Sequence, residues 1–396
     1  MKAIHPQSRF ENFDEGWKNT VLGKISQKVI DKNIGYTITE VFTNSAEHGV
    51  MSQKEYFSHA ITNDKSLNGY YIVVPNDFVY NPRMSGSAPV GPINRNATGR
   101  IGIMSPLYYV FRTHGIDVEY LEYFFKTRLW HQFMWNNGDN GARGDRFSIK
   151  NEVFQQMPIP YPSSFEEQHQ IAQFFSRFDT LIASEDKKIE KLKHFKNASF
   201  EKMFPRKGEI IPQIRFDGFK GEWTKKELNE VACYYRVSNE NIHHQNLLSL
   251  SYGKIVKRNI KSKKGLLPAS FDTYQVIKEN IIVLRFTDLQ NDHKSLRVGL
   301  SKEEGIISPA YVCLECKDSI NPDYLYLLLH YYDLCKVFYG MGDGMRQTLS
   351  YSDIKGLQLL VPKDEKEQQR IVDYFSRIDL LISSQEKKLK VGSIFC

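Results

Sequence analysis

The chain has 396 residues, of which 41% are hydrophobic and 25% charged, and its formal net charge is +7. This composition is typical of a soluble globular protein and excludes disordered, collagen-like and disulfide-rich secreted classes. No apolar run reaches the roughly 18 residues that a membrane span needs, and the first residues lack a signal-peptide core. We therefore expect a cytoplasmic protein of two or more domains, with no membrane partner, whose basic charge would suit an anionic partner.

The chain contains a long internal repeat, because several patterns occur twice in the same order at offsets of about 200 residues. They are Arg9, Phe10 and Trp17 with Arg215, Phe216 and Trp223; GIMSPLY from Gly102 with GIISPAY from Gly305; Tyr120-Leu121 with Tyr324-Leu325; the glycine-rich loops GDNGARGDRFS from Gly138 and GDGMRQTLS from Gly342; and EQHQIAQFFSRFDTLI from Glu167 with EQQRIVDYFSRIDLLI from Glu367. The sequence therefore predicts two units, 1 to about 205 and 206–396. Their formal charges are +2 (24 basic and 22 acidic residues) and +5 (29 and 24).

Each unit is predicted to begin with a module of mixed strands and helices, about 160 residues long. Apolar runs rich in β-branched and aromatic residues, bounded by Gly, Pro and Asn, predict strands at 70–74, 77–80, 281–286 and 310–316. An aromatic helix follows in each module, at 120–135 and at 324–338, and leads into the glycine-rich loop. Since strands and helices do not alternate regularly, the expected fold class is α+β.

A charged, periodic segment closes each unit and predicts a long helix. From Glu166 to about Phe204, apolar residues recur at spacings of three, four and seven, with Ser163 or Ser164 as N-cap and Pro205 at the end. A helix of about 39 residues would be about 58 Å long, and its apolar stripe needs a partner. The equivalent stripe of the second unit predicts an antiparallel coiled coil, within a pseudo-twofold repeat. The two stripes are Ile171, Phe175, Phe178, Ile182, Ile189 and Leu192 in the first helix, and Ile371, Phe375, Ile378, Ile382 and Leu389 in the second.

Two details of these helices carry further expectations. Glu185 and Gln385 interrupt the stripes at the same heptad position, where they either fix the register as a buried polar pair or simply face solvent. The second helix meets Gly392 and lacks an equivalent of residues 196–204, so its paired length is expected to be shorter. The predicted division of the chain is 1–162, 163–205, 206–362 and 363–396.

The sequence offers no arrangement of residues that favours catalysis or metal binding. GMGDG at 340–344 follows a predicted helix, whereas a nucleotide-binding glycine loop follows a strand. Asn321-Pro322 is better explained as an N-cap followed by proline than as part of a methyltransferase motif. Cys313 and Cys316 have the spacing of zinc ligands but no second pair, and residues three apart on a strand face opposite sides. We therefore expect no catalytic residue, metal or cofactor in this chain.

Basic residues are better organised, and they predict contact with DNA. Six lie within 253–264 without an acidic residue, although a solvated charged face is the alternative explanation. Arginines in polar loops suit phosphate contacts and bidentate reading of guanine, while asparagine and glutamine can read adenine edges. The adenine-reading candidates are Asn81, Asn94, Asn96, Gln290 and Asn291. The candidate DNA-binding residues are Arg83, Arg95, Arg100, Arg143, Arg146, Lys254, Lys257, Arg258, Lys261, Lys263, Lys264, Arg285 and Arg346.

The repeated segments resemble the specificity subunit of type I restriction-modification systems over nearly the whole chain. The residues that carry this resemblance are the helix starts Glu166-Glu167-Gln168 and Glu367-Gln368-Gln369, the segments FFSRFDTLI and YFSRIDLLI, the two Gly-Ile-[Met/Ile]-Ser-Pro motifs, LLSLSYGKIVKR from Leu247 and IVLRFTDLQND from Ile282. The resemblance implies two target-recognition domains, at 1–162 and 206–362. Each would read one half of a split target in the major groove of double-stranded DNA, with two conserved helices as the spacer.

The resemblance also implies that the chain is not an enzyme. Two methyltransferase subunits would transfer a methyl group from S-adenosylmethionine to adenine, and restriction subunits would translocate and cleave DNA with ATP and Mg²⁺. Two unlike modules predict an asymmetric bipartite target, and about 25 paired helix residues would give a ruler of about 37 Å, or about one turn of DNA. The alternatives are a self-contained DNA methyltransferase or nuclease, which the missing motifs argue against, and a coiled-coil adaptor without a DNA role.

Overall fold

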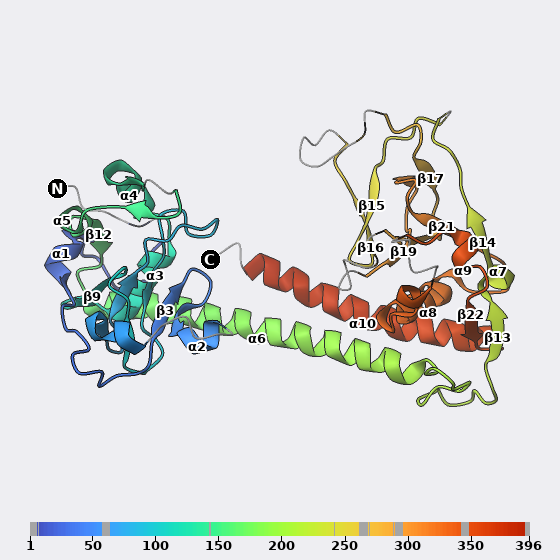
Figure 1. Cartoon of the computed structure of the whole chain (residues 1–396), viewed down its shortest axis with the longest axis horizontal. Helices are drawn as coiled ribbons and strands as arrows, with labels where there is room; N and C mark the ends of the chain where they lie inside the picture. Colours follow the sequence, from blue (N-terminus) through green and yellow to red (C-terminus); the bar gives the residue numbers. More distant parts are fainter. Residues whose placement is uncertain are drawn as a thin grey trace. The chain divides into compact units, whose positions relative to one another are not determined.

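The structure is a computed structural model that describes residues 6, 8–57, 64–141, 144–240, 242–260, 268, 270–287, 289, 296–341 and 348–392. The chain divides into two compact units, residues 1–181 and 182–395, and the boundary lies inside one long helix, α6 (Phe165–Met203). Each unit holds one module of strands and short helices, blue to green in the first and yellow to red in the second (Figure 1). The predicted α+β class is confirmed, because both modules mix antiparallel strands with helices.

The first unit is built on a four-stranded antiparallel sheet in the order β2-β9-β6-β7, with the two-stranded pairs β1-β12, β3-β4, β5-β8 and β10-β11 around it. Its strands are β1 (Lys18–Val21), β2 (Ser26–Lys28), β3 (Phe42–Ser45), β4 (Gly49–Ser52), β5 (Tyr71–Val73), β6 (Phe78–Tyr80), β7 (Ile93–Arg95), β8 (Gly102–Met104), β9 (Tyr109–Thr113), β10 (Asp139–Asn140), β11 (Phe147–Ser148) and β12 (Pro158–Tyr161). Its short helices are α1 (Leu22–Ile25), α2 (Gln53–Tyr56), η1 (Asp64–Gly69), α3 (Val118–Lys126), α4 (His131–Asn137) and α5 (Asn151–Phe154).

The second unit repeats this plan with the antiparallel sheet β14-β21-β18-β19 and the pairs β13-β22, β15-β16 and β17-β20. Its strands are β13 (Thr224–Glu227), β14 (Ala232–Tyr235), β15 (Leu248–Ser251), β16 (Lys254–Lys257), β17 (Gln275–Ile277), β18 (Ile282–Leu284), β19 (Val298–Leu300), β20 (Gly305–Ile307), β21 (Val312–Cys316) and β22 (Gln358–Val361). Its helices are α7 (Leu228–Val231), α8 (Pro322–Leu334), η2 (Val337–Gly340), α9 (Tyr351–Ile354) and α10 (Glu365–Gly392).

The central strand of each sheet is buried on both faces, as its continuous apolar sequence requires. In β6, Phe78 contributes to the main core beneath α3, whereas Val79 faces a smaller core shared with β3 and β5. In β18, Ile282 and Val283 divide in the same way between the two cores of the second unit. The same strand thus supports a large core on one face and a small core on the other in both units.

The repeated Gly-Ile-x-Ser-Pro-x-Tyr motif forms the same turn in both units. The amide nitrogen of Tyr108 donates to the carbonyl oxygen of Ser105 at 3.0 Å, and Tyr311 donates to Ser308 at 3.2 Å. The glycine that opens the motif has no room for a side chain, because a Cβ at Gly102 would lie 2.5 Å from the Phe42 ring. The motif therefore recurs because it closes the small core.

The first predicted long helix is confirmed almost to the residue, because 166–204 was expected and α6 covers Phe165–Met203, 39 residues. The backbone nitrogen of Glu167 donates to Ser164 Oγ at 3.4 Å, so Ser164 is the N-cap. The second helix, α10, is 28 residues long (Glu365–Gly392). The division of the chain at residues 162, 205 and 362 stays a prediction.

Within the second unit, α10 runs antiparallel to the second half of α6, and Figure 1 draws the two helices side by side. Lys196 Nζ lies 2.6 Å from Asp379 Oδ1, and the Phe200 and Phe375 rings stack with their centroids 4.2 Å apart. Nearer the end of α10, Lys193 pairs with Glu386 at 3.1 Å. As the residue numbers on α6 decrease, the numbers of their partners on α10 increase. This is the antiparallel arrangement expected from the sequence.

The apolar stripe of α6 packs in both units, its first residues in the first unit and its last residues in the second. Ile171 packs against the core of the first unit, and the Phe175 ring lies 5.4 Å from Tyr123 on α3. Both residues thus have apolar partners within the first unit, and their expected pairing with α10 stays a prediction. Phe178 contacts Phe174 on its own helix (4.8 Å between ring centroids), and Ile182 is half-buried. The remaining stripe residues, Ile189, Leu192, Ile371, Phe375, Ile378, Ile382 and Leu389, are buried or half-buried in the second unit.

Glu185 and Gln385 match neither expectation fully. Both are half-buried, and Glu185 Oε1 accepts a hydrogen bond from Lys188 of the same helix at 2.6 Å. Glu185 Oε2 and Gln385 Oε1 are enclosed without a hydrogen-bond partner. Across the described residues, the two side chains do not form a polar pair with each other.

Each aromatic helix predicted from the sequence is divided in the structure. The first becomes α3 and α4, separated where Thr127 Oγ1 donates to the carbonyl oxygen of Phe124 at 2.7 Å. The second becomes α8 and η2, separated at Lys336, whose φ of 60° lies in the left-handed region. The apolar pattern continues across both breaks, so hydrophobic periodicity alone did not reveal them. The interpretation of Asn321-Pro322 as N-cap and first helical residue is confirmed.

Candidate nucleic-acid interface

Two of the predicted arginines meet on one surface of the first unit. The backbones of Arg83 and Arg146 form an isolated antiparallel bridge, with a backbone hydrogen bond on each side of it (2.8 and 3.0 Å). Phe147, the neighbour of Arg146, is buried in the main core and anchors the loop. Both arginine side chains are exposed. Arg143, from the same loop, lies outside the described residues.

A groove beside Arg146 adds a further cation and apolar side chains to this surface. Its lining includes Lys28, Leu107 and Tyr108. Lys28 Nζ lies 5.4 Å from the centre of the Tyr109 ring, and Leu107 is 59% exposed. Cationic groups beside exposed apolar side chains suit a ligand with a charged backbone and flat bases.

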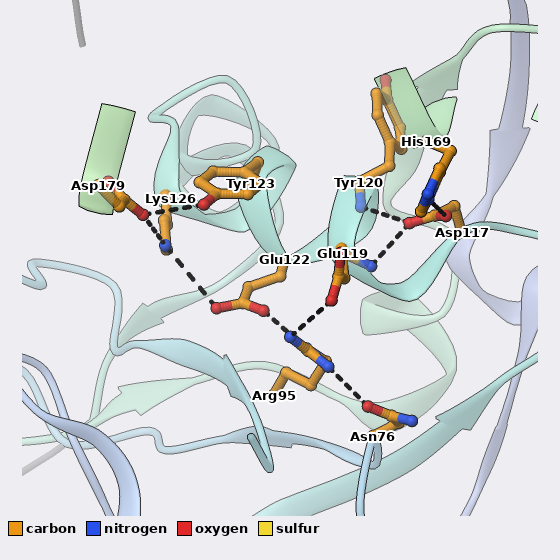
Figure 2. A network of polar contacts seen from close by, with 10 residues as sticks. All are labelled: Asn76, Arg95, Asp117, Glu119, Tyr120, Glu122, Tyr123, Lys126, His169 and Asp179. Atoms are coloured by element: carbon orange, nitrogen blue, oxygen red, sulfur yellow. Dashed lines mark hydrogen bonds and ion pairs between the residues drawn. The ribbon is translucent and has the colours of Figure 1, made fainter. Parts of the chain in front are cut away.

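The Arg95 side chain is bound by other side chains of the first unit and does not face DNA as the sequence predicts. Its side chain is 15% exposed and donates to Glu122 (2.6 Å) on α3 and to Asn76 (2.6 Å). Figure 2 shows how this network continues through Lys126 to Asp179 of α6, at 3.0 Å. Arg95 therefore ties β7 to α3, because two carboxylates of that helix point at it.

The asparagines predicted to read adenine also have internal partners. Asn94 Nδ2 donates to Asn44 Oδ1 (2.7 Å), and Asn81 Nδ2 donates to the carbonyl oxygen of Asn44 (2.8 Å). Asn96 is fully buried and donates to the carbonyl oxygen of Arg100 at 2.9 Å. These contacts contradict the expected adenine contacts, because the amide groups already hold the sheet edges together.

Arg100 is intermediate between the exposed Arg146 and the internally bound Arg95 in how available its side chain is. Its side chain is 46% exposed and pairs with Glu55 at 3.3 Å and with Glu40 at 3.4 Å. Exposed ion pairs of this kind contribute little to stability and exchange partners easily. Arg100 thus stays a candidate for DNA contact.

In the second unit, the hairpin β15-β16 carries the exposed basic residues. Its two-residue turn, Tyr252-Gly253, has φ values of 46° and 74°, as a type I′ turn requires. Glycine adopts such angles freely, whereas they are strained for a bulky residue such as tyrosine. Tyr252 is nevertheless 76% exposed, the largest value among the exposed large hydrophobic residues described. Packing does not explain it, which points to a role in binding.

The basic residues after this turn differ in whether they form an ion pair. Lys257 Nζ lies 2.7 Å from Glu303, and the hydrogen bonds from Lys257 and then from Asn246 lower the pKa of Glu303. Lys254 and Arg258 are exposed, and neither has an ion-pair partner in the described part of the chain. These two cations are consequently the best placed for phosphate contacts.

Of the other predicted residues of the second unit, Arg285 is half-buried and the rest are not described. Arg285 is half-buried at the end of β18, and its carbonyl oxygen accepts a hydrogen bond from Arg297 Nη1 at 3.1 Å. Arg297 is fully buried and also donates to the carbonyl oxygen of Thr287 at 2.6 Å. Lys261, Lys263, Lys264, Arg346, Gln290 and Asn291 lie outside the described residues.

Titratable groups in the second core have shifted pKa values that reflect burial. Burial raises the pKa of both Cys313 and Cys316 to about 12, so both thiols are protonated at neutral pH. Burial and, to a smaller extent, Lys196 lower the pKa of His330 to about 4. Among the residues that the structure describes, no cluster of three or more His, Cys, Asp and Glu could hold a metal ion.

The family model described as "Type I restriction modification DNA specificity domain" matches residues 33–194 and again residues 220–391. The chain belongs to this family. The two matches include most of each module and most of each long helix. We call residues 1–162 specificity domain 1 and residues 206–362 specificity domain 2. The internal repeat is therefore a duplication of one specificity domain.

Named relatives agree with this assignment. A stretch of 109 residues is 33% identical to the Type I restriction enzyme MjaIX specificity subunit of Methanocaldococcus jannaschii; it spans 27% of this chain but only 22% of that subunit. A chain from a structure of a type I R-M system matches with 13% identity and a TM-score of 0.56, covering 97% of this chain and 96% of that chain. The type I restriction-modification S subunit from M. genitalium gives 13% identity and a TM-score of 0.53, covering 100% and 96%. At such identities the structural matches show the fold.

No helix in the described ranges is long and apolar enough to cross a membrane.

Three features of the specificity domains were not predicted from the sequence. Lys28 lies on a short strand far from Arg146 in sequence and joins it only in the groove. Tyr252-Gly253, between the alternating runs LSLS and KIVK, could have been recognised as a hairpin turn. The third feature is the contact between Arg9 and Glu167, although both residues recur in the repeat.

Proposed function

We propose that the chain reads both halves of a bipartite, asymmetric target in double-stranded DNA, one half with each specificity domain. The observation that carries the proposal is that two domains of one topology expose different side chains at equivalent places. The β3-β4 hairpin has a three-residue loop, 46–48, with an acidic Glu47, whereas β15-β16 turns at Tyr252-Gly253 and continues into Lys254 and Arg258. Unlike surfaces on one framework suit unlike half-sites.

Phosphate contacts would supply most of the affinity in this proposal. In domain 1 they would come from Arg83, Arg146 and Lys28, and in domain 2 from Lys254 and Arg258. These side chains lie on loops or sheet edges that the cores hold in place, so little entropy is lost when they bind. Base reading in the major groove would then fall to neighbouring side chains such as Tyr252.

Catalysis would belong to other subunits. We propose that two methyltransferase subunits supply S-adenosylmethionine and transfer its methyl group to adenine, and that restriction subunits supply ATP-driven translocation and cleavage in the cytoplasm. The chain itself would hold no cofactor. The family membership supports this division of labour.

The long helices would act as the ruler between the half-sites. The antiparallel contacts from Lys193 to Phe200 with α10 support a rigid helix pair. Lengthening both helices by one heptad should change the number of base pairs between the half-sites and leave both half-site sequences unchanged. Methylome sequencing that found altered half-site sequences would overturn the ruler.

The proposed function is tested by co-expressing the chain with type I methyltransferase subunits and sequencing the methylome. We expect adenine methylation at one bipartite, non-palindromic sequence, and none from the purified chain alone. Methylation by the chain alone would instead indicate a self-contained methyltransferase. Duplex binding measured from 50 to 200 mM salt should weaken steeply, whereas an adaptor without a DNA role would show no such dependence.

Charge reversal locates the contact surface in domain 2. Lys254→Glu together with Arg258→Glu should lower duplex affinity by about 10- to 100-fold and reduce the salt slope by about 2. Lys355→Glu together with Lys363→Glu, two exposed lysines outside the hairpin, makes the same change of four charges and is the control. Equal losses in both variants would discard the hairpin as a contact surface.

A further inference from the structure

A buried ion pair joins the start of the chain to the start of α6. Arg9 Nε and Nη2 donate to the two carboxylate oxygens of Glu167, each at 2.7 Å, and the Glu167 side chain is 0% exposed. Trp17 Nε1 also donates to Glu167 at 3.2 Å. The hydrogen bond with Glu167 is the main cause that raises the pKa of Arg9 above its usual value.

The same pair recurs at the start of α10. Arg215 Nε and Nη2 donate to the two carboxylate oxygens of Glu367, at 2.6 and 2.7 Å, and the Glu367 side chain is 1% exposed. Arg9 and Arg215 each donate a further hydrogen bond to a backbone carbonyl oxygen six residues on. Two copies that differ over most of their surfaces therefore keep this contact in the same geometry.

The next residue along each helix, Gln168 or Gln368, forms hydrogen bonds with further segments of the module. Gln168 accepts a hydrogen bond from the backbone nitrogen of Asp117, the N-cap of α3, at 2.8 Å, and donates to the carbonyl oxygen of Pro162 at 2.9 Å. Gln368 makes the equivalent contacts to Asn321, the N-cap of α8, at 3.1 Å, and to Pro362 at 3.4 Å. Glu and Gln at each helix start thus contact three separate segments of the module.

We propose that the joint formed by Arg9, Glu167 and Gln168, and its copy formed by Arg215, Glu367 and Gln368, fixes the angle between each specificity domain and its long helix and so restricts the chain to one spacer length. This inference rests on the proposed function. A bidentate arginine-carboxylate pair is directional, because both hydrogen bonds require the guanidinium and carboxylate to be coplanar. Apolar contacts at the same place would allow the helix to tilt or turn.

Physical reasoning separates this role from simple stabilisation. A buried ion pair contributes little net stability compared with apolar side chains of similar size, and its better-supported use is to select one geometry. Successive base pairs differ by about 34° of rotation and about 3.4 Å along the DNA axis. A domain that can turn through part of that range on its helix would accept a spacer one base pair longer or shorter.

The test uses the full chain, co-expressed with type I methyltransferase subunits, in which Arg9→Met and Glu167→Leu are combined. We expect the variant to keep its thermal unfolding midpoint within a few degrees and to keep both half-site sequences. Methylation at sites whose spacer is one base pair longer or shorter should rise at least about tenfold over the wild-type level. A folded variant that retains the single wild-type spacer would overturn the inference.

A matched control removes an arginine-carboxylate pair with a buried carboxylate that does not touch the helix. Arg112 donates to both carboxylate oxygens of Asp77, at 2.7 and 3.0 Å, and Asp77 is fully buried. Arg112→Met with Asp77→Asn should leave the spacer unchanged. Broadening of the spacer in this control to the same extent would show general loosening and would also overturn the inference.

A milder variant decides the question if the double variant does not fold. Arg9→Lys keeps the charge but loses the planar fork, so it should broaden the spacer to an intermediate degree. Arg9→Lys with an unchanged spacer would overturn the inference. If the wild-type chain directs no methylation to any bipartite site, the proposed function fails instead, and the two failures are thereby distinguished.

Discussion

Position 126 of specificity domain 1 and position 330 of specificity domain 2 have the same place in the fold, six residues after the repeated tyrosines Tyr120 and Tyr324. Lys126 is 47% exposed and pairs with Asp179 of α6 at 3.0 Å. His330 is 7% exposed, its Nδ1 has no hydrogen-bond partner, and its ring lies 5.4 Å from Phe200. One position is therefore a polar surface contact in domain 1 and part of an apolar core in domain 2.

The difference follows from the number of helices that cover each module. In the second unit, Phe200 at the end of α6 and Phe204 just after it join the core, in addition to α10. In the first unit, α3 faces the start of α6 through the polar network of Figure 2. The glutamate and glutamine at each helix start make the same contacts in both domains. The duplication has thus preserved the joints while the helix packing beyond them differs.

The largest expected effect comes from the core phenylalanine of α10. Phe375 is fully buried and stacks on Phe200, whereas the equivalent Phe175 is half-buried against Tyr123. Phe375→Ala should lower the free energy of unfolding of the second unit by about 3–5 kcal/mol. Phe175→Ala should cost the first unit about half as much or less, since less apolar surface is lost. Hydrogen exchange in urea resolves the two units, and equal costs would contradict the comparison.

Acid should destabilise the second unit through His330. Its pKa of about 4 in the fold is below the ordinary value of 6.5, so folding favours the neutral ring. The contribution of this ring to the free energy of unfolding is fully present above pH 6.5. It is lost as the pH decreases to 4, by about 1.4 kcal/mol per pH unit and about 3 kcal/mol in total. His330→Leu should remove this dependence, as measured by urea unfolding at pH 7.5 and 4.5. Parallel pH profiles for wild type and variant would show that the ring does not titrate as argued.

Arg146 and Arg95 should separate binding from stability in domain 1. Arg146→Gln should reduce duplex affinity by about 3- to 10-fold and the salt slope by about 1, with unfolding unchanged. Arg95→Gln should lower the free energy of unfolding of the first unit by about 1–2 kcal/mol, because Glu122 loses a buried partner, and leave affinity nearly unchanged. Fluorescence anisotropy and thermal melts measure the two properties. A large affinity loss in Arg95→Gln would return this residue to the DNA surface.

The smallest expected effect on stability is at the hairpin turn of domain 2. Tyr252→Gly removes a strained side chain, so the second unit should gain about 0.5 kcal/mol after the entropy cost of glycine. If Tyr252 contacts a base, the same variant should relax the sequence preference of one half-site about tenfold in the methylome. Tyr252→Asn, which tolerates the left-handed conformation, controls for the backbone. Unchanged specificity in both variants would remove Tyr252 from the interface.

The sequence predicted features that depend on local patterns. The duplication, the bounds of α6 and the strands at 70–74 and 281–286 all rest on periodicity or on repeated residues, which do not require knowledge of the packing. The antiparallel pairing was also predicted, because only the second helix offered a matching stripe. These features define the α+β framework.

The candidate site was predicted less well, because its residues are decided by partners distant in sequence. Arg95 looks like an exposed loop arginine until α3 places Glu122 beside it, 27 residues away. Asn96 looks polar and free until the fold buries it completely. Ile171 and Phe175 fit a helix pair equally well by spacing, and only tertiary packing assigns them to the module. Arg83 and Arg146 stayed exposed because their neighbours, rather than their own side chains, anchor the loop.

The assignment of the end of α6 to the second unit has a consequence for synthesis on the ribosome. Ser199 of α6 and Tyr374 of α10 form a hydrogen bond across 175 residues of sequence. At about 5–20 residues per second, the covering helix emerges about 10–35 s after the segment it covers. During that interval the apolar face around Ile189 and Phe200 lacks the α10 side chains, including Phe375, that cover it in the folded chain. The packing of α10 on this face therefore completes the core of the second unit.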